Sequence, residues 1–385
     1  MYQTVCLHNA NVLTGFSVMP RCAVLIDGKK IVDVYNEERF NQKKFSKDVK
    51  VVDVQGAYIM PGFIDTHIHG IGGYGTDDGN PQSILNMSKT LAEYGVTSFI
   101  PTCNAFPEKQ LIKNIHAIVD AMGHEQGSTI LGLHLEGPFL SPKRIGAQAT
   151  NGLSEVDLNY MKRLYKAADK HLINMTVAPE LKGMRELALY CSGKGIILQA
   201  GHTDATYDQM LEGMQANIMH VTHLFNAMRP MHHREPGVVG AALIHSELSC
   251  EIIGDGVHVN PNLVNLLLKC KPLSQIVMIT DALYPAKTDL SMAPDLYLDK
   301  CFYRKEDHVM NGSAISMLDG FRNLISWGIP IEKAVRMTST NPAQIMKQKN
   351  IGLLIPGNDA DIIVLDKNLD LIYTIIKGKF VKGNI

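Results

Sequence analysis

Short apolar runs alternate with segments of helical periodicity through the middle of the chain. Eight runs rich in apolar residues and bounded by glycine, proline or polar residues predict buried strands at 57–64, 96–101, 130–135, 174–178, 196–200, 218–222, 250–253 and 276–280. Segments with the period of amphipathic helices lie between most of these runs, for example at 81–94, 108–122, 155–168, 182–194, 207–216 and 260–269. Eight β/α units in about 290 residues predict an α/β fold, the (β/α)8 TIM barrel, over residues 57–346, with a doubly wound open sheet as the alternative.

The two ends of the chain show a different pattern, in which apolar and polar residues alternate. Residues 24–34 indicate a strand, a tight turn at Gly28 and a second strand, and residues 361–366 and 371–376 indicate two further strands. We therefore predict a small β-sandwich domain formed by both chain termini, residues 1–56 and 347–385, beside the barrel.

Composition limits the class of protein. The 385 residues are 45% hydrophobic and 19% charged with a net charge of -1, which is typical of a globular protein with a large core. No apolar stretch approaches the about 20 residues that span a bilayer, and no signal-peptide pattern is present, so we expect no membrane partner. Near-neutral charge without a basic tract disfavours a nucleic-acid partner. Seven dispersed cysteines without a Cys-x-x-Cys pair indicate reduced thiols and a cytoplasmic protein.

Polar residues that bind metals follow several of the apolar runs. His67 and His69 follow the first run, and residues two apart on a strand share one face. The third, fifth, sixth and eighth runs are followed by Glu136, His202, His223 and Asp281. In a closed barrel the C-terminal ends of these strands converge, whereas an open sheet would not bring them to one point. Imidazole and carboxylate groups bind divalent ions, and one carboxylate can bridge two ions.

Each of these residues alone has an ordinary explanation. An isolated His-x-His is more often a pair of structural histidines, and an isolated glutamate is more often ion-paired. The ordered set favours a metal centre, because an unpaired polar group buried at a strand end costs free energy. His134 and His220 flank ligand positions and could orient the ligands.

The motifs around these positions resemble a known family. The order of the ligands resembles the amidohydrolase superfamily and, within it, the N-acetylglucosamine-6-phosphate deacetylases. The resemblance runs nearly end to end and rests on residues 61–70, 134–139 (His-Leu-Glu-Gly-Pro-Phe), 201–205, 222–228 (Thr-His-Leu-Phe-Asn-Ala-Met), 234–237 (Arg-Glu-Pro-Gly), 254–258 and 280–282.

This resemblance implies metal-dependent hydrolysis of the acetamide of a phosphorylated amino sugar, N-acetylglucosamine 6-phosphate. The main ion would be held by Glu136, His202 and His223. A second ion would be held by His67 and His69, which would share Glu136. Zinc is the expected ion, with iron or another divalent ion as alternatives, at one or two ions per subunit.

Asp281 would act as the catalytic residue, which takes the proton of the attacking water and delivers it to the leaving amine. Arg234 would grip the phosphate of a neighbouring subunit, which implies a homodimer. From spacing alone, a loop salt bridge with Glu235 is an equal alternative for Arg234. Asp255 would shape the loop after the seventh strand. The other implied substrate-binding residues are Ala147, Gln148, Asn226, Ala227, His258, Met310, Asn311 and Gly312.

Two departures from the family pattern bear on the substrate. Gln148 stands where the family usually has a histidine, and Met310-Asn311-Gly312-Ser313 replaces the usual Leu-Ala-Gly-Ser loop. A deacetylase for N-acetylgalactosamine 6-phosphate therefore stays an alternative. A hydantoinase or dihydroorotase is disfavoured, because Ala178-Pro179-Glu180 stands where those enzymes carry a modified lysine. A non-catalytic barrel is also disfavoured, because all six ligand positions are kept.

Overall fold

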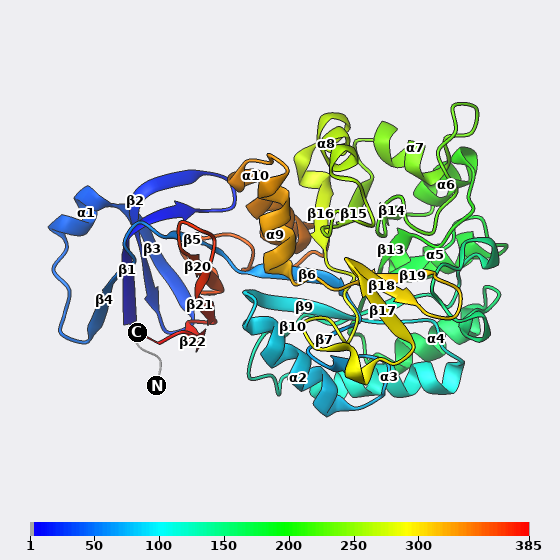
Figure 1. The fold of residues 1–385 in the computed structure, drawn as a ribbon, viewed down its shortest axis with the longest axis horizontal. Helices are drawn as coiled ribbons and strands as arrows, with labels where there is room; N and C mark the ends of the chain where they lie inside the picture. The colour runs from blue at the N-terminus through cyan, green and yellow to red at the C-terminus, as the bar shows by residue number, and fades with distance from the viewer. Residues whose placement is uncertain (1–3, 385) are drawn as a thin grey trace.

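The structure, a computed structural model, describes residues 4–384 and has two parts that lie side by side along its long axis (Figure 1). A small β-sheet, drawn mainly in blue and red, lies beside a barrel drawn in cyan, green and yellow. The first strand and the last strand both belong to the small sheet. The predicted fold class, a TIM barrel with a small β domain from both ends of the chain, is confirmed. The exact domain boundaries stay a prediction.

The small part is one continuous sheet with a core of its own. Its strands run in the order β22-β21-β20-β5-β1-β2-β3, and β4 pairs with β1. Their bounds are β1 Thr4–Leu13, β2 Val18–Asp27, β3 Lys30–Asn36, β4 Val49–Asp53, β5 Tyr58–Pro61, β20 Ile362–Leu365, β21 Leu371–Ile376 and β22 Lys379–Lys382. Val24, Ile59 and Val364, from strands far apart in sequence, share one buried cluster. Burial of this cluster couples the two ends of the chain.

Eight parallel strands form the barrel. They are β6 Phe63–Ile68, β9 Val96–Cys103, β11 Leu133–Glu136, β12 Leu172–Val177, β13 Ile197–Ala200, β14 Ile218–Val221, β15 Ser249–Ile253 and β16 Ile276–Ile279. The short β10 Thr129–Ile130 adds to β9. The first and last barrel strands meet where the backbone N–H of Asp281 donates to the carbonyl of His67 over 2.9 Å. All eight strands therefore point their C-terminal ends toward one mouth.

Helices surround the barrel, and half of them start at a side-chain cap. Asn80 and Asn260 accept from the backbone at the starts of two helices whose first residue is proline, and Thr206 closes a capping box with Gln209. The helices are α2 Pro81–Ala92, α3 Glu108–Ala121, α4 Leu158–Ala167, α5 Met184–Gly193, α6 Tyr207–Gln215, α7 Gly237–Ile244, α8 Pro261–Cys270, α9 Met317–Ser326, α10 Ile331–Val335 and α11 Asn341–Ile345, with α1 Glu37–Gln42 beside the small sheet. Within residues 4–384 no helix is long and apolar enough to cross a membrane.

Two parts of the fold differ from the pattern-based prediction. The apolar run at 57–64 is divided, since β5 joins the small sheet and β6 opens the barrel. The division falls at Gly62, where a Cβ atom would lie 2.0 Å from Thr97 Cγ2, so only glycine fits this crossing. A three-stranded sheet, β17 Leu296–Asp299, β18 Cys301–Arg304 and β19 Met310–Ser313, covers part of the mouth and was not predicted.

Candidate metal centre and active site

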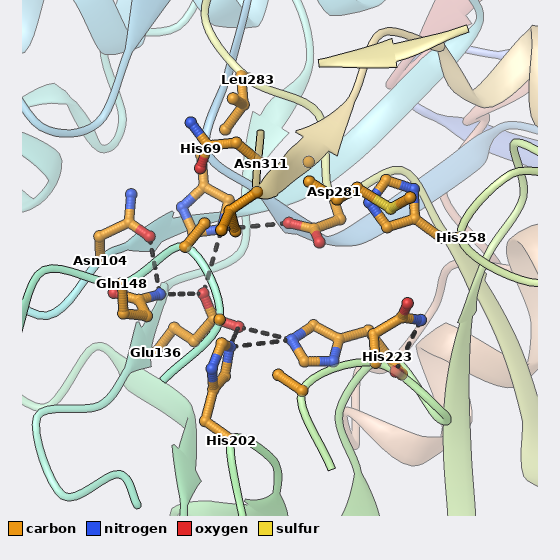
Figure 2. Close-up of a pocket in the computed structure, with 17 residues that line it drawn as sticks. His69, Asn104, Glu136, Gln148, His202, His223, His258, Asp281, Leu283 and Asn311 are labelled. Carbon is orange, nitrogen blue, oxygen red and sulfur yellow. Dashed lines mark hydrogen bonds and ion pairs between the residues drawn. The ribbon is translucent and has the colours of Figure 1, made fainter. Parts of the chain in front are cut away.

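The six candidate ligands gather at the mouth of the barrel, where Figure 2 shows all of them except His67. They come from the ends of five strands: β6, β11, β13, β14 and β16. Two groups each have ligand atoms within 4.8 Å of one another, namely Glu136 with His202 and His223, and Asp281 with His67 and His69. The structure thus brings together every residue that the sequence offered as a ligand.

Glu136 lies between the two groups. Its Oε1 is 2.9 Å from His223 Nε2 and 3.1 Å from His202 Nε2. Its Oε2 is 3.3 Å from His69 Nε2. On the far side, Asp281 Oδ1 is 3.3 Å from His69 Nε2 and 3.5 Å from His67 Nε2. One carboxylate therefore faces both groups, as a bridging ligand does.

The hydrogen bonds of two histidines fix which ring nitrogen can bind a metal. His202 Nδ1 lies 3.0 Å from the carbonyl of Ile145, which can only accept, so Nδ1 carries the proton and Nε2 is free. His67 Nδ1 lies 3.1 Å from Glu251 Oε2, and His67 Nε2 has no hydrogen-bond partner although it is buried. Bare Nε2 atoms that converge with carboxylate oxygens are the donor set of a divalent zinc- or iron-type ion, so the residues fit such an ion.

Three ligand positions have strained backbones. The φ angles of His202, His223 and Asp281 are 46°, 27° and 49°, in the left-handed region that favours glycine. Such a conformation costs on the order of 1–3 kcal/mol per residue and persists where the surrounding fold imposes it. Strain at three separate strand ends that meet at one point indicates a functional site.

The local charges favour a cation at the centre. Although burial alone lowers it, the Glu136 and Asp281 carboxylates hold the pKa of His67 well above its usual range. Burial alone also lowers the pKa of His69, but the same two carboxylates outweigh burial and raise this pKa to about 9. Burial raises the pKa of Asp281, but the charge of His67 and the hydrogen bond from His69 outweigh it and leave that pKa lowered. The carboxylates therefore form a buried negative site that binds protons or metal ions.

A cavity of about 240 Å³ opens beside Glu136 and Asp281. Eight residues that the resemblance offered for the substrate line this cavity: Ala147, Gln148, Asn226, Ala227, His258, Met310, Asn311 and Gly312. Arg234 and Asp255 do not line it. Arg234 is exposed on the loop after β14 and bonds His233. Among the ion pairs of residues 4–384, none joins Arg234 to Glu235, so the alternative salt bridge is not formed.

Gln148, the departure from the family pattern, contacts the bridging carboxylate. Its Nε2 donates to Glu136 Oε2 over 2.6 Å and to Asn104 Oδ1 over 2.9 Å. Its Oε1 accepts from the backbone of Ala105 over 2.9 Å. All its hydrogen-bonding atoms are used, so Gln148 holds Glu136 in place.

Asp255 acts on the cavity through His258. Its Oδ1 accepts from the backbone of Val257 and of His258, both over 2.9 Å, and its Oδ2 lies 2.6 Å from His258 Nδ1. This pairing leaves His258 Nε2 for the cavity that the ring lines. The sulfur of Cys301 lies near the pair, but Asp255 and His258 are satisfied by each other.

Sequence reasoning missed five residues of the site. Glu251 bonds His67, Asn104 bonds Gln148 and lines the cavity, and the cavity is also lined by Gly146, Leu283 and Val309. A signal existed for Glu251, because a lone carboxylate inside an apolar strand needs a partner. Of the histidines expected to orient ligands, His220 lies 3.5 Å from Glu251, whereas His134 bonds Thr102 and Thr176.

Comparison with known proteins agrees with this geometry. The model of the amidohydrolase family matches residues 58–381. N-acetylglucosamine-6-phosphate deacetylase from Vibrio furnissii is 33% identical over 84% of this chain and 82% of its own. N-acetylgalactosamine-6-phosphate deacetylase from Escherichia coli O157:H7 is 28% identical over 86% and 89%. The crystal structure of N-acetyl-D-glucosamine-6-phosphate deacetylase from Mycobacterium smegmatis superposes with a TM-score of 0.90 at 27% identity, over 98% of this chain and all of the other. The chain belongs to the amidohydrolase family, and the resemblance to its N-acetylglucosamine-6-phosphate deacetylases is confirmed.

Proposed function

We propose that this protein is an N-acetylglucosamine-6-phosphate deacetylase, which hydrolyses the acetamide of the phosphorylated sugar to acetate and the free amine. The observation that carries the proposal is Asp281, an ionised carboxylate beside the convergent Glu136 and histidine atoms at the wall of the cavity. The relatives and solved structures of the same family support the substrate class.

The donor set supports two divalent ions, with zinc as the first choice. Glu136, His202 and His223 would hold one ion, and His67 and His69 would hold the other with Glu136 between them. When bound, such an ion polarises a carbonyl oxygen and lowers the pKa of water from about 15.7 to about 7. The amide of Gln148 donates to Glu136 and would keep this carboxylate oriented while its two oxygens face the two ions.

Asp281 moves the proton of the reaction. As an ionised carboxylate it takes the proton from the water that attacks the acetyl carbonyl. It then gives this proton to the amide nitrogen, so that the amine leaves neutral when the carbon–nitrogen bond breaks. Its position 3.3 Å from His69 keeps the carboxylate in place through both transfers.

The sugar phosphate would lie in the same cavity. Asn226, Ala227 and His258 line it and offer amide, backbone and imidazole donors. Arg234 does not line its own cavity and bonds His233, which supports a homodimer in which it reaches the phosphate bound by the neighbouring subunit. Seven free cysteines, six of them buried, suit the cytoplasm expected from the sequence.

Acetate release from the two epimers, N-acetylglucosamine 6-phosphate and N-acetylgalactosamine 6-phosphate, tests the proposal. The zinc-loaded protein is expected to release acetate faster from the gluco sugar. A preference for the galacto sugar would move the chain to the activity of its Escherichia coli relative. If the zinc-loaded protein releases no acetate from either sugar, deacetylation is refuted and a binding protein is favoured.

A further inference from the structure

Glu251 is a carboxylate in the interior of the barrel that the proposed reaction does not use. It lies within β15 and is fully buried. Its ion-pair contacts, among the residues the structure describes, are His67 at 3.1 Å and His220 at 3.5 Å, with no lysine or arginine. A buried carboxylate without a permanent cation is costly, so a position of this kind calls for a reason.

The geometry links Glu251 to one metal ligand. A carboxylate only accepts hydrogen bonds, so the short contact to His67 Nδ1 places the proton there. In the neutral ring that binds a metal, His67 Nε2 then carries the lone pair, and it faces Glu136 at 3.6 Å and Asp281 at 3.5 Å. This buried Nε2 has no hydrogen-bond partner.

His67 is the anchored member of its pair. His69 Nδ1 has no hydrogen-bond partner, so no outer contact sets the orientation of that ring. His202 in the other group is oriented by backbone carbonyls and does not depend on Glu251. The nearest approach of Glu251 to the other group is a contact of 3.4 Å from the backbone nitrogen of His223 to Oε2, which is at the limit of a hydrogen bond.

The charges of the buried carboxylates also connect Glu251 with ion binding at the His67–His69 site. Glu136, Asp281 and Glu251 carry three negative charges, and the imidazoles that bind a metal are neutral. Two divalent ions beside Glu136 and Asp281 alone would leave a net charge of about +2 in the barrel interior, and Glu251 lowers this charge to about +1. Glu251 therefore lowers the electrostatic cost of binding a second cation.

We propose that Glu251 is a positioning residue for the second ion: it fixes the tautomer and orientation of His67 and supplies negative charge beneath the His67–His69 site. This inference rests on the two-ion centre of the proposed function. It concerns ion binding at one of two sites, so it is tested without sugar substrate.

The experiment titrates metal-free protein with Zn²⁺ against a competing chelator and measures the affinity of each ion. Glu251→Gln is expected to bind the first ion like the parent and the second about 10–100-fold more weakly, as is typical when the outer partner of a ligand is lost. The matched control is Asp361→Asn, which makes the same carboxylate-to-amide change at a buried position in the small sheet and is expected to bind both ions like the parent.

A double-mutant cycle separates positioning from general damage to the fold. In a His67→Gln background, where only the charge of Glu251 still acts, Glu251→Gln is expected to weaken binding of the second ion less than it does in the parent. Equal affinity of Glu251→Gln and parent for the second ion, or an equal loss at both sites, would overturn the inference. If Glu251→Gln does not fold, Glu251→Asp, which keeps the charge and withdraws the oxygens from His67, is expected to show the same selective loss.

The number of ions bound by the parent protein and its release of acetate separate the role of Glu251 from the proposed deacetylation. A parent that binds one ion only would refute the two-ion centre and the role of Glu251 with it. A parent that binds two ions but releases no acetate would refute deacetylation and leave the role of Glu251 to be decided by its variants.

Discussion

Asp361 gives the protein a pH-dependent weakness at the junction of the small sheet and the barrel. Its backbone carbonyl accepts from Gly62, where the chain crosses between the two parts. Its side chain is 4% exposed, and Oδ1 accepts from the backbone of Lys377 over 2.7 Å while Oδ2 has no hydrogen-bond partner. Burial raises the pKa of this carboxyl from 3.8 to about 6.

The sign of the effect follows from the raised pKa. Between pH 4 and about 6 the folded protein holds a proton on Asp361 that the unfolded chain has lost. The contribution to stability is therefore complete below pH 3.8 and is lost as the pH rises through about 6. The change in pKa corresponds to about 3 kcal/mol in total, of which about 1.4 kcal/mol falls between pH 5 and pH 8.

Asp361→Asn tests this magnitude. Asparagine keeps the acceptor for Lys377 and resembles the protonated acid, because each is neutral and places an unpaired donor group at the position of Oδ2. The free energy of unfolding in urea, measured for zinc-loaded variant and parent at both pH values, is expected to show the variant gaining about 1.4 kcal/mol relative to the parent from pH 5 to pH 8. The pH dependence of the metal centre cancels in this comparison, since both proteins share it.

A difference between variant and parent that stays constant from pH 5 to pH 8 would refute the reasoning. It would mean that Asp361 titrates alike in the folded and unfolded protein, so that burial at the junction does not disfavour its charge. A difference that shrinks with rising pH would reverse the sign and indicate a partner that stabilises the carboxylate.

Three further predictions concern the mouth of the barrel. Asp281→Asn is expected to keep the main ion but lower kcat about 10²–10⁴-fold, as the loss of a general acid-base group does; near-parent turnover with normal zinc content would remove its role. Arg234→Ala is expected to raise KM for the phosphorylated sugar far more than for the unphosphorylated one, and equal effects would exclude it from the phosphate site. Gln148→Leu removes the amide that donates to Glu136 and is expected to weaken zinc binding about 10–100-fold, measured against Gln148→His, which keeps a donor; parent-like affinity would contradict the contact.

The regular part of the fold could be predicted because burial imposes a pattern on the sequence. Barrel strands are buried on both faces, so β16 appears as a continuous apolar run. The division of the run at 57–64 could not be predicted in this way, because both strands that it contains are buried and only the crowding at Gly62 marks the change of sheet. The sheet β17–β19 has short, half-exposed strands whose pattern is close to that of a loop.

The candidate metal ligands could be predicted because each lies at the C-terminal end of a strand or just after it, where a buried polar residue has few structural reasons to be. Glu251 lies inside a strand, so its role depends on a partner that the sequence does not place. Gln148 is a similar case, since its loop position indicates contact with the site but not that it holds Glu136. Outer contacts of this kind depend on three-dimensional neighbours and carry no sequence period.

The proposed second metal site is built around the contact that closes the barrel. The backbone of Asp281 donates to the carbonyl of His67, and the backbone of His69 donates to the carbonyl of Ala282, both over 2.9 Å. The first and last barrel strands are therefore joined by the residues whose side chains face one another across this site. Because the same hydrogen bonds set the register of the strands and the positions of the ligands, a shift that opened the barrel would also separate Asp281 from the two histidines. The strained φ of Asp281, 49°, is held by this closure, so the stability of the barrel maintains the geometry of the site.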